Sequence, residues 1–108
     1  MTKPQSTSSY VKRPRRISDE RVYDTIVEMV RANPEKAIRP EDVARSLRDR
    51  EWQGLLKRIR LFVAKLASDG YVAIMRKGRI ADPDDFKGVY RIVAGENTTA
   101  YVARMPQE

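Results

Sequence analysis

The sequence contains neither cysteine nor histidine. The chain therefore cannot form disulfides, bind metals through thiolate or imidazole, or use a cysteine nucleophile or an imidazole-dependent serine triad. Carboxylate, lysine and tyrosine chemistry remains available, but the acidic residues are scattered rather than gathered in a recognisable catalytic arrangement. We therefore expect a protein that binds rather than catalyses, with no resident metal or cofactor.

Long apolar runs are also lacking, since none approaches the roughly 18 residues that a membrane span requires. The N-terminal run MTKPQSTSSYVKRPRR is basic, but no apolar segment follows it, so it does not resemble a secretory signal. Apolar residues make up 41% of the 108 residues and charged residues 34%, which suits one small globular domain. We expect a soluble, cytoplasmic protein.

Positive charge is abundant and unevenly placed. The formal net charge is +7, with +5 and no acid in residues 1–17, +6 in residues 57–79, and −4 over the rest of the chain. The first 17 residues are also rich in serine, threonine and proline and have little to bury, which predicts a disordered basic tail. A localised positive field favours an anionic macromolecule as partner.

Two helices are predicted after the tail. Ser18 is a suitable N-cap for a helix that should end near Ala32, before Pro34. A short extended stretch, residues 37–39, separates it from a second helix that begins at Pro40 and ends near Leu47.

The third helix has the strongest apolar pattern, and we expect Asp49 to cap it and Gly70 to stop it. Its predicted buried stripe consists of Leu55, Leu56, Ile59, Phe62, Val63, Leu66 and Ala67.

The C-terminal half predicts a β-hairpin. Residues 71–75 and 89–93 are rich in β-formers, and the long loop between them contains a predicted capped helical turn at residues 82–85. The order of helices and strands is that of a winged helix-turn-helix: an α+β fold, mainly α, with three helices and a small antiparallel sheet carrying a long wing loop. We assign this domain to residues 18–94. Residues 95–108 form a partly disordered C-terminal extension that either adds an edge segment near residues 100–102 or frays.

Several runs of residues carry a resemblance to a known family. The segments AIRPEDVARSL, AKLASDGYVAIMRKGRIADP and KGVYRI, together with Trp52, resemble a family of small bacterial winged-helix proteins of unknown function. The most specific elements are IRPxxVAR, which begins at Ile38, and KGRxxDP, which begins at Lys77. The resemblance spans about residues 20–93 and implies the winged-helix fold without an assigned activity.

In winged-helix proteins the second helix of the helix-turn-helix enters the DNA major groove. Here that is the third helix, whose outward face is cationic and free of acids. Basic side chains there would contact phosphates, Gln53 could pair with adenine, and Leu61 could touch a thymine methyl. Leu61 could equally pack under the wing or mark a protein interface. An interpretation of this face as a solvent-exposed basic surface without a partner is given the same weight as the DNA-binding interpretation. The candidate residues are Gln53, Lys57, Arg58, Arg60, Leu61 and Lys65.

The wing and the tail supply further candidates. Arg76, Lys77 and Arg79 suit phosphate or minor-groove contacts, but the acids at positions 82, 84 and 85 oppose such a role, and local ion pairing of Arg79 with them is slightly favoured. The tail residues Lys12, Arg13, Arg15 and Arg16 would follow a nucleic-acid backbone, unless the tail is only a solubilising extension.

The aromatic residues are interpreted as packing groups. Trp52 more often closes a small core than stacks on bases, and the same holds for Tyr71, Phe86 and Tyr90. The leading hypothesis is thus a double-stranded DNA-binding protein, of the kind that includes transcriptional regulators. A protein-interaction module and RNA binding through the tail are the alternatives.

Overall fold

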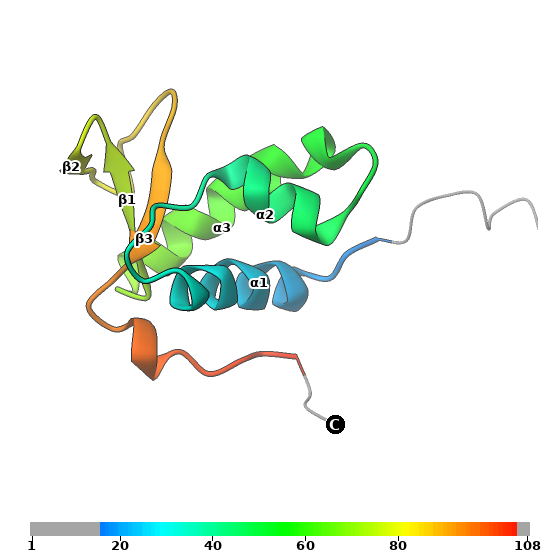
Figure 1. Ribbon diagram of the computed structural model, residues 1–108, viewed down its shortest axis with the longest axis horizontal. Helices are drawn as coiled ribbons and strands as arrows, with labels where there is room; N and C mark the ends of the chain where they lie inside the picture. Colours follow the sequence, from blue (N-terminus) through cyan, green and yellow to red (C-terminus); the bar gives the residue numbers. More distant parts are fainter. Residues whose placement is uncertain (1–15, 106–108) are drawn as a thin grey trace, which may run out of the picture.

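The computed structural model describes residues 16–105 and contains three α-helices beside a small antiparallel sheet (Figure 1). This confirms the predicted α+β, mainly α, winged-helix fold. The α-helices are α1 (Asp19–Ala32), α2 (Pro40–Leu47) and α3 (Leu56–Ser68). The strands are β1 (Val72–Arg76), β2 (Arg79–Ile80) and β3 (Arg91–Ala94), and two 3-10 helices are η3 (Trp52–Leu55) and η4 (Thr98–Ala100).

The first two helices begin and end as predicted. The Ser18 hydroxyl accepts a hydrogen bond from the Arg21 amide at 3.2 Å, which satisfies one of the unpaired N–H groups of the first turn of α1. Pro40 occupies the first position of α2, where its missing N–H costs nothing.

The start of the third helix differs from the prediction. Asp49 does not cap it, because the chain first makes a left-handed turn at Glu51 (φ 57°) and then the 3-10 helix η3. The Gly54 amide donates to the Glu51 carbonyl at 3.2 Å, so backbone bonds take the place of a side-chain cap. The tight entry leads directly into α3, which ends before Gly70 as expected.

The sheet has the strand order β2-β1-β3, with Val72 opposite Ala94 and Met75 opposite Arg91. The segment between α1 and α2 joins it through a bridge between Ile38 and Ile92. The first predicted strand is confirmed within a residue, and the second lies slightly later than predicted. Strand β2 was not predicted, because two residues carry no detectable alternation.

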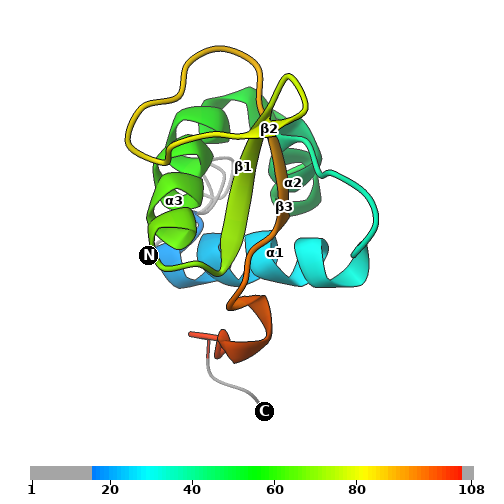
Figure 2. The same cartoon turned by 90° about the vertical axis from the view of Figure 1, so that its left-hand side faces the viewer.

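The core lies where the helices meet the inner face of the sheet (Figure 2). The core consists of residues from the centre of the predicted α3 stripe, from one face of α1 and from one face of β1. Tyr90 is buried, and the other predicted packing aromatics, Trp52, Tyr71 and Phe86, are half-buried against the core. The largest fully buried side chains include Ile26, Ile59, Leu66, Ile74 and Ile92.

The segment after β3 packs on α1. It adds no strand to the described part of the sheet, but passes through η4 and runs along the side of α1 that faces away from α2 and α3 (Figures 1 and 2). The guanidinium of Arg31 donates to the carbonyls of Thr98 at 2.6 Å and Tyr101 at 2.7 Å. Tyr101 itself is buried. Residues 95–105 are therefore attached to the domain by specific contacts.

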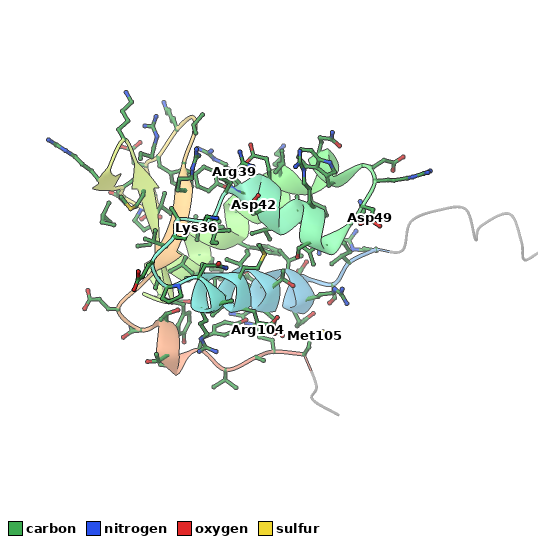
Figure 3. The ribbon with its side chains drawn as sticks, in the orientation of Figure 1. Lys36, Arg39, Asp42, Asp49, Arg104 and Met105 are labelled. Atoms are coloured by element: carbon green, nitrogen blue, oxygen red, sulfur yellow. The ribbon has the colours of Figure 1, made fainter. Side chains whose placement is uncertain are left out.

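A buried carboxylate anchors this segment. Asp24 on α1 accepts hydrogen bonds from the Tyr101 hydroxyl at 2.6 Å and from the Arg104 and Met105 amides at 2.7 and 2.8 Å. Figure 3 shows Arg104 and Met105 beside α1. Burial alone would raise the pKa of Asp24, but these three hydrogen bonds together lower it below its ordinary value. Burial, and then the bond to Asp24, raise the pKa of Tyr101. Asp24 is thus a charged acceptor for three donors.

Replacing Gly95 with alanine is expected to lower the free energy of unfolding by about 2 kcal/mol, because its Cβ would overlap the Gly70 carbonyl oxygen and the two backbones would have to separate. Gly54→Ala is the matched control, since no atom lies within 4 Å of its added Cβ. Chemical denaturation of both variants measures the difference. Equal stabilities would contradict the close packing of the turn after β3 against the start of β1.

Candidate nucleic-acid interface

One stripe of α3 and its preceding turn faces solvent. Gln53, Lys57, Leu61 and Lys65 are all exposed, as the helical period predicts, and Leu61 is 63% exposed. Within residues 16–105, none of the four makes an ion pair or a side-chain hydrogen bond. The sequence prediction of an outward, acid-free α3 face is therefore confirmed for these four residues. The stripe offers an amide, two ammonium groups and one apolar side chain.

Arg58 is not part of this stripe. Its guanidinium pairs with the Asp19 carboxylate at 2.6 Å and donates to the Ile17 carbonyl. The centre of the Phe62 ring lies 5.7 Å from the guanidinium carbon. These contacts attach the start of α1 to α3. Because the Asp19 carboxylate balances the charge of the Arg58 guanidinium, Arg58 adds little positive potential to the candidate interface.

Arg60, predicted to contact phosphate, instead holds the wing loop, residues 81–90. Its guanidinium donates to the Phe86 carbonyl and, at 3.4 Å, to the Gly88 carbonyl. It also lies 4.3 Å from the centre of the Phe86 ring and 5.4 Å from that of Tyr90. The loop is therefore folded back onto α3 by a cation that stacks and donates at the same time.

Replacing Arg60 with alanine should lower the backbone ¹⁵N order parameters of residues 86–89 from about 0.85 to below about 0.6, because the carbonyl bonds that restrain the loop are lost. Arg79→Ala, which removes an exposed cation, is the control. If both variants leave the order parameters of this loop at the parent values, Arg60 does not restrain it.

The basic wing residues divide into a structural one and two exposed ones. Arg76 donates from Nε to the Val89 carbonyl at 3.1 Å and so ties β1 to the loop. Lys77 and Gly78 form the two-residue turn between β1 and β2, both with positive φ (52° and 79°), as a type I′ turn requires. Lys77 and Arg79 are exposed at this turn.

The acidic wing residues do not neutralise Arg79. Among the described residues Arg79 makes no ion pair with the acids at positions 82, 84 and 85, so the favoured local pairing was wrong. The predicted helical turn is a single hydrogen-bonded turn, in which the Asp82 side chain accepts from the Asp84 amide at 2.9 Å. The acids remain exposed on the loop.

Arg16 is exposed at the beginning of the described chain. Lys12, Arg13 and Arg15 lie outside the described residues. The structure therefore brings together the α3 stripe, shows Lys77 and Arg79 exposed at the hairpin turn, and assigns Arg58, Arg60 and Arg76 to intramolecular contacts.

A cleft beside the stripe was missed by the sequence analysis. It has a volume of about 480 Å³ and lies between the first turn of α2, one side of α3 and residues 88–91. Glu41, Lys57, Arg60 and Tyr90 are among its lining residues. The sequence analysis identified Lys57 and Arg60 as basic candidates and Tyr90 as a packing group. It could not identify the cleft, because three segments that lie far apart in the chain form it and leave no local sequence pattern.

Three helices, the bridge at Ile38 and a sheet that extends into a wing define the chain as a winged-helix protein. The chain belongs to the family described as "Protein of unknown function (DUF3253)", whose model matches residues 19–95. A search of curated proteins finds no match to the chain. Within residues 16–105, no helix is both long and apolar enough to cross a membrane.

Proposed function

We propose that this protein binds double-stranded DNA without catalysing a reaction, with α3 in the major groove and the β1–β2 turn on the phosphate backbone. The observation that carries the proposal is the exposed α3 stripe, in which Lys57 and Lys65 flank Leu61 and α3 itself contributes no acid. In this arrangement the two ammonium groups bind phosphates, Gln53 reaches base edges and Leu61 meets thymine methyl groups.

The exposed wing residues support the same partner. Lys77 and Arg79 extend the positive surface at the tip of a hairpin whose first strand packs against α3. Phosphate contacts from these two side chains and from Lys57 and Lys65 would release four counterions. A slope of about −3.6 in log K against log salt follows, and the basic tail steepens it further.

Fluorescence anisotropy with a labelled duplex at a series of salt concentrations tests this proposal on the full chain. We expect binding at low salt that weakens with at least this slope. Absence of binding to several duplexes at about 50 mM salt, where electrostatic binding is strong, would contradict it.

A protein-interaction surface is the second candidate, favoured by the exposure of Leu61 (63%), Ile80 (66%) and Val89 (75%). Contiguous exposed apolar surface often marks a site that a partner covers. If this reading holds, Leu61→Ser reduces self-association or partner binding in sedimentation experiments, and duplex DNA has no effect on the Lys57 amide.

A further inference from the structure

Tyr90, one of the residues that line the cleft between α2, α3 and residues 88–91, carries a polar group without a partner among the described residues. Tyr90 is 5% exposed, and its hydroxyl is buried without a hydrogen-bond partner in the described part of the chain. A buried hydroxyl without a partner is costly, and native proteins usually avoid it. Neighbouring atoms cover the hydroxyl, so an acceptor in the cleft satisfies this donor once the covering side chains move aside.

A phenol is already protonated at neutral pH, and burial raises the pKa of Tyr90 further, to about 12, so its hydroxyl is a hydrogen-bond donor. Arg60 opposes this increase and Glu41 adds to it. Both of these charged residues line the cleft, which places the phenol within the electrostatic field of its walls.

The charged groups of the cleft favour an anion. Lys57, Arg60 and Arg91 are the cations of its lining and Glu41 is the one acid. Leu56, Val89 and Pro40 provide apolar surface beside them. A volume of about 480 Å³ lies within the range of small-molecule sites, roughly 300–1,000 Å³.

We propose that this cleft binds a small organic carboxylate with an apolar body, whose carboxylate accepts a hydrogen bond from the Tyr90 hydroxyl beside Lys57 and Arg60. The apolar body lies against Leu56 and Val89. This site does not depend on DNA binding, although Lys57 belongs to both surfaces, so a bound anion would compete with phosphate for it.

Titration of the ¹⁵N-labelled full chain with naphthalene-2-carboxylate, without DNA, tests the proposal. We expect saturable shifts at the amides of residues 56, 57 and 89–91, and binding at least tenfold weaker for the uncharged naphthalene-2-carboxamide. Equal affinity for the two compounds, or shifts scattered outside the cleft, would overturn it. Shifts at these amides with duplex DNA but none with the carboxylate would also overturn it and assign the cleft to the DNA backbone.

Four single variants make the test independent of damage to the fold. Tyr90→Phe removes only the unpartnered hydroxyl and should weaken carboxylate binding about tenfold without lowering the thermal midpoint. Tyr71→Phe, outside the cleft, should leave the affinity unchanged. Glu41→Gln should tighten binding about threefold, because it removes the one acid of the lining, whereas Lys57→Gln should weaken it to a similar extent. Identical affinities in the parent, Y90F and E41Q proteins would overturn the assignment.

Discussion

Replacing Asp24 with alanine should lower the free energy of unfolding by about 3 kcal/mol. The carboxylate is 5% exposed and accepts bonds from the Tyr101 hydroxyl and two backbone amides, so its loss leaves three donors without their acceptor. The segment after residue 100 should detach from α1. Denaturant unfolding measures the loss, and protease cleavage within residues 101–105 reports the detachment.

Glu28→Ala is the control, because it removes an exposed carboxylate from the same helix. It should change the stability by less than about 0.5 kcal/mol. A D24A protein as stable as E28A would contradict the anchoring role of Asp24.

The pH dependence of stability has a definite sign at the same residue. Hydrogen bonding outweighs burial and lowers the pKa of Asp24 in the folded state. The stabilising contribution of the carboxylate is therefore fully present at pH values above the ordinary pKa of 3.8. The contribution is lost as the pH falls through the lowered folded-state value. Denaturation at pH values from 6 down to 2 should therefore show a smaller acid-dependent loss of stability in D24A than in the parent protein.

The double variant K57A/K65A should bind duplex DNA about 60-fold more weakly at 0.1 M salt. Each lysine that leaves a phosphate contact reduces the slope of log K against log salt by about 0.9, and the two together reduce it by about 1.8. Both side chains are exposed on α3, so the fold should be unaffected. Anisotropy titrations from 0.05 to 0.3 M salt measure the affinity and the slope together.

The control for this variant is R21A/K36A, which removes the same charge from exposed positions on α1 and in the following loop. It should retain the parent slope. If both double variants lose the same affinity, net charge rather than the α3 stripe governs binding, and the proposed docking is wrong.

The fold could be predicted because local signals agree with the tertiary arrangement. Ser18, Pro40 and Gly70 each mark an element boundary that the structure confirms, and the apolar period of α3 determines which of its faces is buried. The same period placed Lys57 and Lys65 on the solvent side. The Asp49 cap was wrong because Glu51 adopts a left-handed conformation, and backbone bonds of η3 replace the expected side-chain bond.

Long-range contacts could not be predicted. Nothing near Asp24 in the sequence indicates that it meets residues 101–105, about 80 positions later, and the acid is unremarkable on a helix with other charged residues. Likewise, Arg58, Arg60 and Arg76 have the same sequence character as Lys57, but each finds a carbonyl group from a distant segment. Guanidinium groups reach such acceptors because they present several donors in a plane.

The central claim is that the α3 stripe meets duplex DNA, and amide chemical-shift perturbation of the ¹⁵N-labelled full chain with a generic duplex at two salt concentrations tests it most directly. We predict perturbations at residues 53, 57, 61, 65 and 77–79 that diminish at the higher salt concentration. Amides around Asp24 and Tyr101, on the side of α1 that faces away from α3, should not respond. Perturbations absent from α3, or confined to the surface around α1 and residues 101–105, would contradict the account.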